Sequence, residues 1–169
     1  MRTFGRFLGR LLLVVVLCVG AAFVFGPDEQ ISLTPTVQDS DIGADVDAYF
    51  AAQEAQFDDI TPGTEKRVVW HSERGEKTPV VLVYLHGFSA TSEEIRPVPD
   101  RVAEALGANL VYTRLQGHGR DGAALAEATV QDWINDVTEA LNVARRIGSE
   151  VVVMGTSTGG TLLAALADS

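Results

Sequence analysis

The sequence predicts an α/β fold, in which a mostly parallel sheet is flanked by helices and preceded by an N-terminal apolar helix. Two observations predict this fold. Short apolar runs alternate with segments of helical spacing, and glycines follow the ends of two of the predicted helices. Such alternation produces right-handed βαβ units and therefore a parallel sheet. With 169 residues, 46% hydrophobic and 21% charged, the chain is long enough to bury a sizeable core.

Four strands are expected. The first spans Lys66–Ser72, and the other three are apolar runs typical of strands buried on both faces, at Val80–Leu85, Asn109–Thr113 and Val151–Met154. The predicted helices are an amphipathic one at Asp45–Phe57 and others at Pro99–Leu106, Thr129–Ile147 and Thr158–Ala167. In the third of these, apolar residues recur at three- and four-residue steps, and Gly148 is expected to end the helix.

The chain is expected to have four parts. Residues 1–27 form a signal anchor or transmembrane segment and residues 28–42 a polar linker. Residues 43–60 form a peripheral amphipathic helix, and residues 61–169 belong to the main α/β domain.

The N-terminal segment has the composition of a membrane anchor. Three arginines precede an uncharged run, Leu11–Gly26, whose length lies between a signal-peptide core and a full span. The run continues through Phe23–Phe25, beyond the small residues that could be cleaved, which favours an uncleaved single-pass anchor. The alternative is export after signal cleavage. In both cases the basic flank stays cytoplasmic and the main domain faces the extracytoplasmic, periplasmic-type side. The single cysteine, Cys18, lies in this run and excludes an internal disulfide.

Charge and motif content exclude several functions. The formal net charge is -10, and the first 27 residues contain only arginines among charged types, so all 23 acidic residues lie in the remainder. Such a surface repels phosphates, and no nucleic-acid partner is expected. We also find no metal-ligand spacing and no phosphate-binding glycine loop, so no metal is expected.

The sequence Gly155-Thr156-Ser157-Thr158-Gly159 matches G-x-S-x-G. It directly follows a predicted strand and opens a predicted helix, which is the context of a nucleophile elbow. The sharp turn lifts the Ser157 hydroxyl clear of the backbone, and Gly155 and Gly159 are needed where a Cβ would clash. Ser157 is therefore the candidate catalytic nucleophile.

A second motif, His86-Gly87-Phe88, ends the strand predicted at Val80–Leu85. Acyl transfer generates an oxyanion, which two backbone N–H groups stabilise when they point at one position. One donor is expected from Thr158, the residue after the nucleophile, and the other from Phe88 in the loop after the earlier strand. His86 and Gly87 are expected to support this loop.

His118 lies between two glycines in the loop after Asn109–Thr113. Elbow enzymes place their catalytic base after the serine in the chain, so His118 is predicted to be a supporting loop histidine instead.

Together, the motifs resemble the lipase/esterase branch of the α/β-hydrolase superfamily, which includes monoacylglycerol lipases, small bacterial carboxylesterases and serine-aminopeptidase-like hydrolases. The resemblance extends from Lys66 to Asp168 and rests on the segments Val80–Phe88, Gly117-His118-Gly119, Asp132-Trp133 and Gly155–Gly159. It implies an incomplete α/β-hydrolase fold, with residues 61–169 as its N-terminal part, Ser157 as nucleophile and the Phe88 and Thr158 amides as the oxyanion hole.

The sequence departs from this family after the elbow. Beyond Ser157 there is one carboxylate, Asp168, and no histidine. Asp168 follows the elbow helix too closely to be the triad acid. The triad acid and base are therefore expected to be missing from this chain, which would be a fragment, inactive alone and prone to aggregate through an exposed apolar edge at Val151–Met154.

The expected activity of the complete protein is hydrolysis of small-molecule carboxylic esters by acyl transfer through Ser157. This chemistry needs no cofactor, and none is expected. Two alternatives remain open from the sequence: a serine peptidase or thioesterase with the same fold, and a non-catalytic, truncated, membrane-tethered module.

Overall fold

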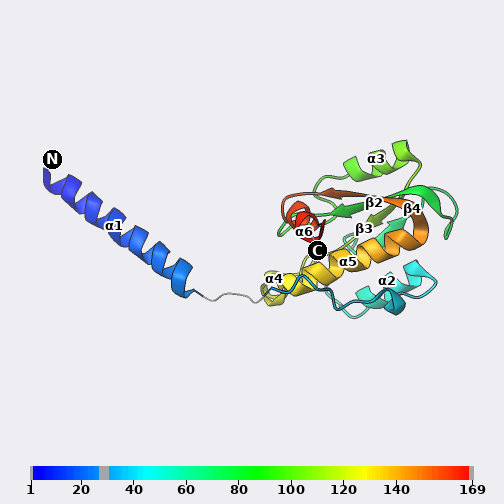
Figure 1. Ribbon diagram of the computed structural model, residues 1–169, viewed down its shortest axis with the longest axis horizontal. Helices are drawn as coiled ribbons and strands as arrows, with labels where there is room; N and C mark the ends of the chain where they lie inside the picture. The colour runs from blue at the N-terminus through cyan, green and yellow to red at the C-terminus, as the bar shows by residue number, and fades with distance from the viewer. Residues whose placement is uncertain (1, 27–30, 168–169) are drawn as a thin grey trace. The chain divides into compact units, whose positions relative to one another are not determined.

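The structure is a computed structural model that describes residues 2–26 and 31–167, in two compact units divided after Ile31. Residues 28–30 of the expected linker lie outside the described residues, as do Pro27, at the end of the expected anchor, and Asp168. The first unit contains helix α1, Arg2–Phe25 (Figure 1). Its 24 residues span about 36 Å at ~1.5 Å per residue. The segment Phe4–Phe25 is long and apolar enough to cross a membrane, and its large apolar side chains are exposed.

The second unit is built on a four-stranded sheet of order β1-β3-β2-β4. Strands β2 (Thr78–Leu85), β3 (Asn109–Tyr112) and β4 (Gly148–Gly155) are parallel. The short edge strand β1 (Arg67–Val69) pairs with β3 in the antiparallel direction. The prediction of a mostly parallel sheet is confirmed. The first strand is shorter than expected, because only its middle residues pair.

Helices cover both faces of the sheet (Figure 1). On one face lies α3, Val98–Leu106, over a core that contains Leu82 and Tyr84 of β2. On the other face lies a larger core around Val81, Val83 and Leu85 of the same strand. This second core is covered by three helices, α2 (Val46–Glu54), α5 (Val130–Ile147) and α6 (Thr158–Ala167). The continuous apolar run of β2 is thus explained, since alternate residues enter different cores.

The α5 helix begins with a capping box. Thr129 accepts a hydrogen bond from the Asp132 N–H, and the Asp132 carboxylate accepts one from the Thr129 N–H at 2.9 Å. The sequence placed Thr129 inside the helix, whereas it is the N-cap. Gly148 ends α5 as predicted, but it does so as an extended residue that begins the next strand. Its φ of -166° is extended, and it already begins β4, where a Cβ would collide with Val81 and the Thr78 carbonyl oxygen.

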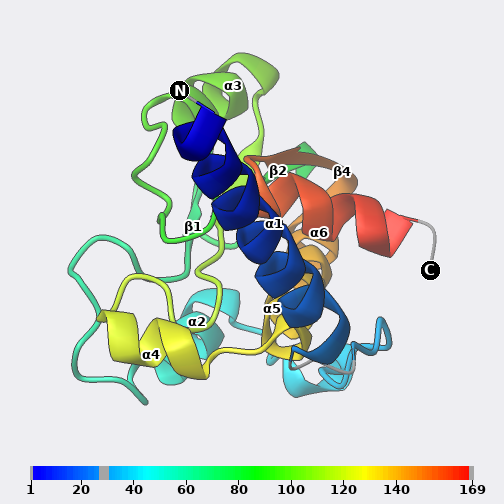
Figure 2. The same cartoon turned by 90° about the vertical axis from the view of Figure 1, so that its left-hand side faces the viewer.

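Two short elements were not predicted. Helix α4, Gly122–Glu127, precedes α5 (Figure 2). The Asp121 carboxylate caps it by accepting from the Ala124 N–H. A 3-10 turn, η1, spans Asp39–Asp41 in the segment expected as linker. This turn is held on α5 by an ion pair between Asp39 and Arg146, and the next residue, Ile42, is buried.

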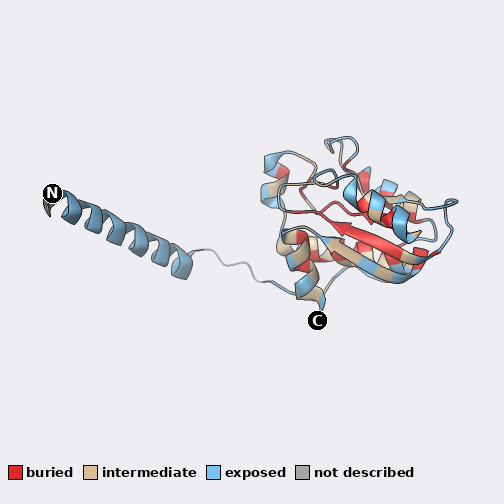
Figure 3. Ribbon diagram, turned by 90° about the horizontal axis from the view of Figure 1, so that it is seen from above, coloured by how far each residue is buried: buried red, intermediate tan, exposed pale blue. Residues whose placement is uncertain are grey.

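The β4 strand forms the other edge of the sheet (Figure 3). Its residues are mostly intermediate or exposed, and Val152 is 44% exposed, whereas residues 81–85 of β2 are fully buried. The apolar run Val151–Met154 therefore lies at an exposed edge in this chain, as the sequence predicts.

Candidate active site

The G-x-S-x-G segment forms a sharp turn between β4 and α6. Gly155 is the last residue of β4, and Thr158 is the first residue of α6. Between them, Ser157 has a φ of 47°, a left-handed conformation that costs a non-glycine residue free energy. Ser157 is exposed. The serine thus lies on a strained strand-to-helix turn, at the N-terminus of helix α6.

The two motif glycines are required by close backbone contacts. A Cβ on Gly155 would lie 2.7 Å from the Gly160 nitrogen. A Cβ on Gly159 would collide with the Leu85 carbonyl oxygen and lie 2.8 Å from that of His86. Real Cβ atoms essentially never come within 3.0 Å of such backbone atoms, so the elbow packs directly on the carboxyl end of β2.

The His86-Gly87-Phe88 loop lies beside this turn because β2 and β4 are neighbours. Leu85 pairs in register with Gly155, and the Thr156 N–H donates to the Leu85 carbonyl oxygen at 3.0 Å. The position of a Cβ on Gly87 is 3.6 Å from the Ser157 Cβ. The structure therefore brings together the serine and the loop that the sequence singled out.

His86 is a buried, neutral imidazole with a defined tautomer. Its Nε2 lies 3.1 Å from the Leu115 N–H, which can only donate, so Nε2 carries no proton. Nδ1 therefore carries the proton and donates to the Gly87 carbonyl oxygen at 2.9 Å. Burial lowers the pKa of His86 to about 4, which keeps the ring neutral at physiological pH.

This contact orients the Phe88 amide. The Gly87 carbonyl and the Phe88 N–H belong to one trans peptide, in which the two groups point in opposite directions. The Gly87 oxygen is held by His86 and also accepts from the Ala90 N–H at 3.3 Å. The Phe88 N–H consequently points away from His86.

His118 joins this loop through aromatic contacts. Its ring centroid lies 4.8 Å from that of His86, 6.0 Å from that of Phe88 and 5.6 Å from that of Trp133. Nδ1 lies 3.2 Å from the Gln116 carbonyl oxygen, and burial lowers the pKa of the ring. Nε2 is buried, with no hydrogen-bond partner among residues 31–167. Phe88, in contrast, is 58% exposed.

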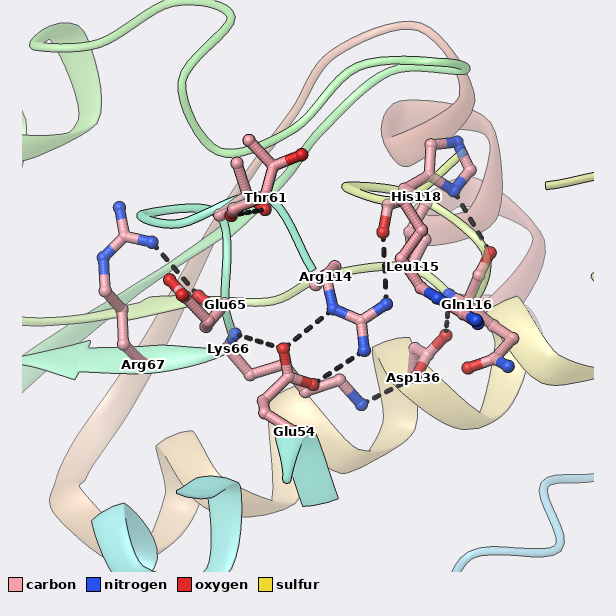
Figure 4. Close-up of polar contacts among 12 residues, drawn as sticks. Glu54, Thr61, Glu65, Lys66, Arg67, Arg114, Leu115, Gln116, His118 and Asp136 are labelled. Carbon is pink, nitrogen blue, oxygen red and sulfur yellow. Dashed lines mark hydrogen bonds and ion pairs between the residues drawn. The ribbon is translucent and has the colours of Figure 1, made fainter. Parts of the chain in front are cut away.

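A buried charge network, which we did not predict, supports the loop after β3 (Figure 4). Arg114 makes two hydrogen bonds of 2.8 Å to the Glu54 carboxylate, and its third nitrogen donates to the His118 carbonyl oxygen at 3.1 Å. Asp136 accepts from the Gln116 N–H at 2.6 Å and pairs with Lys66 at 2.8 Å. The network thus fixes both sides of the turn that carries His118.

The Lys66 ammonium stays charged inside this network. Burial alone would lower its pKa, but the carboxylates of Asp136 and Glu139, at 2.8 and 2.6 Å, outweigh that effect and raise it. The pairing partners lie up to 73 residues apart in the chain, so sequence spacing alone contains no signal for them. A second unpredicted cluster, Tyr84, Glu94 and Thr156, lies at the elbow itself.

No group of three or more metal-ligating side chains is present in the described ranges, 2–26 and 31–167.

Comparisons with known proteins agree with this geometry. The sequence model of the alpha/beta hydrolase family matches residues 80–169. A thermostable monoacylglycerol lipase of Bacillus sp. (strain H-257) is 33% identical over 93 residues, which are 55% of this chain and 37% of the lipase. A solved structure from work on LipS and LipT, two metagenome-derived lipolytic enzymes, matches with a TM-score of 0.53 and 26% identity, over 61% of this chain and 39% of that one.

The chain thus spans little more than a third of the length of these two relatives. The family match nevertheless covers more than half of the 169 residues and includes both motifs of the site. The chain belongs to the alpha/beta hydrolase family.

Proposed function

We propose that the complete protein is a serine hydrolase of carboxylic esters, with Ser157 as its nucleophile. The observation that carries this proposal is the left-handed, exposed Ser157 on a strand-to-helix turn, with Gly87 beside it. The left-handed backbone conformation that places the Ser157 hydroxyl on this turn is unfavourable for a non-glycine residue. Backbone strain of this kind is concentrated at functional sites.

The reaction follows from the groups around Ser157. The Ser157 Oγ attacks the ester carbonyl carbon and gives its proton to a general base, while the carbonyl oxygen becomes an oxyanion. The Phe88 and Thr158 N–H groups are the proposed donors to that oxyanion. Collapse of the tetrahedral intermediate expels the alcohol, which takes the proton back, and water then hydrolyses the acyl-enzyme.

We expect the general base to be a histidine outside residues 1–169. All three histidines of this chain precede Ser157, whereas the base follows the serine in elbow enzymes. His86 in particular cannot act as the base, since both of its ring nitrogens already bond to the backbone. The chain on its own is therefore proposed to be inactive.

Lipid-like esters are the proposed substrate class. The two relatives are described as a monoacylglycerol lipase and as lipolytic enzymes. The exposed apolar ring of Phe88, which lies edge-on to Trp133 at 6.2 Å between centroids, offers an apolar surface next to the elbow. Such a surface suits an acyl chain better than a charged peptide.

The test is covalent labelling of the longest polypeptide encoded by the reading frame with a fluorophosphonate probe. Ser157→Ala is expected to abolish labelling. Ser149→Ala, which makes the same chemical change at the exposed opposite end of β4, is the control and is expected to label like the parent. Labelling that survives Ser157→Ala would rule out this nucleophile.

We further propose that α1 anchors the protein in a membrane, with the acidic domain on the extracytoplasmic side. The length and apolar surface of Phe4–Phe25 support an anchor, and the N-terminal arginines favour a cytoplasmic N-terminus. Untagged protein should remain in the membrane pellet after high-salt and alkaline washing. Recovery of the protein in the cytosolic fraction would contradict both the anchor and export.

A further inference from the structure

A turn after the Phe88 loop places one carboxylate against both halves of the site. Glu94 lies on an exposed turn, but its Oε1 accepts hydrogen bonds from the Gly87 N–H at 2.8 Å and from the Tyr84 hydroxyl at 2.6 Å. Its Oε2 lies 3.2 Å from the position that a Gly87 Cβ would take. The carboxylate therefore fills the space that Gly87 leaves open.

The second contact continues to the elbow. The Tyr84 oxygen lies 3.0 Å from the Thr156 Oγ1. Since the Tyr84 proton is given to Glu94, the Thr156 hydroxyl is the donor in this pair. Burial, together with the Glu94 contact, raises the pKa of Tyr84, so that the phenol keeps its proton. A continuous chain of hydrogen bonds thus joins Thr156, Tyr84, Glu94 and Gly87.

Gly87 needs such a restraint more than any other residue type would. Glycine has the widest choice of backbone conformations, and a loop built on it loses the most entropy when it is fixed. Its carbonyl oxygen is already held by His86, and Glu94 holds its N–H. Both backbone polar groups of Gly87 are therefore fixed, and with them the orientation of the Phe88 amide.

We propose that Glu94 is a positioning residue that sets the separation between the two oxyanion donors, the amides of Phe88 and Thr158. The inference rests on the proposed function, because it assumes that these amides bind an oxyanion. Each donor lies within two residues of a group in the hydrogen-bonded chain, Phe88 next to Gly87 and Thr158 two residues after Thr156. An oxyanion is stabilised well only when both N–H groups reach it at once.

The proposal depends on the acceptor oxygen of Glu94 and not on its charge. Glu94→Gln keeps an oxygen that can accept from Gly87 and Tyr84, whereas Glu94→Ala removes it. Tyr84→Phe leaves the Gly87 contact and breaks the link to Thr156. Glu93→Ala is the matched control, because Glu93 is an exposed neighbour whose carboxylate pairs with Arg67 and Arg96.

The experiment measures the rate constant and the apparent affinity of fluorophosphonate inactivation in the full-length membrane-anchored protein. In this reaction the bond from Ser157 Oγ to phosphorus forms, the P–F bond breaks, fluoride leaves, and the serine proton passes to the base. The phosphoryl oxygen occupies the oxyanion site, so misplaced donors should lower the rate constant while the apparent affinity stays the same.

We expect Glu94→Ala to lower the inactivation rate constant by about 10- to 100-fold, in line with the cost of misplacing a catalytic group by about 1 Å. Glu94→Gln should recover most of the loss, Tyr84→Phe should show part of it, and Glu93→Ala should match the parent. Parental rates in Glu94→Ala, or an equal loss in Glu94→Gln, would overturn the proposal. Should Glu94→Ala not fold by circular dichroism, a parental rate in Tyr84→Phe would overturn it. Failure of the proposed function looks different, because Ser157→Ala would then label like the parent.

Discussion

Acidification provides a quantitative test of the His86 contacts. Its pKa is lowered from 6.5 to about 4, because burial disfavours the imidazolium. Since the folded pKa lies below the unfolded one, the unfolded chain binds the proton first as the pH falls. The contribution of neutral His86 to the free energy of unfolding is therefore complete above the unfolded pKa and is lost between about pH 6.5 and 4. Below pH 4 the free energy of unfolding no longer changes with the titration of His86. These two values correspond to a loss of about 2 kcal/mol on going from pH 7.5 to pH 5.

The assay is urea unfolding of the whole chain in a nonionic detergent, followed by tryptophan fluorescence. Trp133 is a suitable reporter because its ring lies 5.6 Å from that of His118. His118 titrates in the same direction, so the effect of His86 is taken as the difference between the parent and the non-titrating variant His86→Gln. The parent should lose about 2 kcal/mol more than the variant between pH 7.5 and 5. Equal losses in both proteins would show that His86 titrates like a solvent-exposed histidine and would refute the conclusion that burial keeps its ring neutral.

Two further substitutions test the packing of the site. Gly159→Ala should destabilise the fold by at least about 2 kcal/mol, because the new Cβ collides with the Leu85 carbonyl oxygen. Gly122→Ala is the control and should change the urea midpoint little, because its Cβ would meet nothing within 4 Å beyond its chain neighbours and the backbone of its own helix. Similar midpoints for the two variants would contradict the close packing. Arg114→Met should cost about 3–5 kcal/mol, since it leaves the buried Glu54 carboxylate without its ion-pair partner. Replacing Glu54 by methionine as well should restore part of that stability in the same urea assay, and a double variant no more stable than Arg114→Met would contradict the pairing argument.

The sequence was sufficient to predict the parallel core and the strand-to-helix turn at Ser157, because both depend on local patterns. An apolar run followed by glycine and serine predicts a strand and a tight turn wherever it occurs in the chain. The position of Gly87 beside Ser157 was also predictable, since neighbouring parallel strands end at the same edge of a sheet.

The remaining features depend on pairings between distant residues. The antiparallel direction of β1 is set by its pairing with β3, and three paired residues contain too little pattern to show it. The contact between Arg114 and Glu54 joins residues 60 positions apart, and Tyr84 reaches Thr156 across 72. Glu94 is only seven residues from Gly87. However, the sequence of a polar turn does not show whether a glutamate in it binds the backbone or only contacts solvent.

The central claim is that the turn at Ser157 presents a nucleophile. Peptide mass spectrometry of the full-length protein after fluorophosphonate treatment tests it most directly. The claim predicts a single phosphonyl adduct on the peptide that contains Ser157, and fragmentation should assign it to that serine. An adduct on another residue, or an unmodified Ser157 in protein that hydrolyses esters, would contradict it.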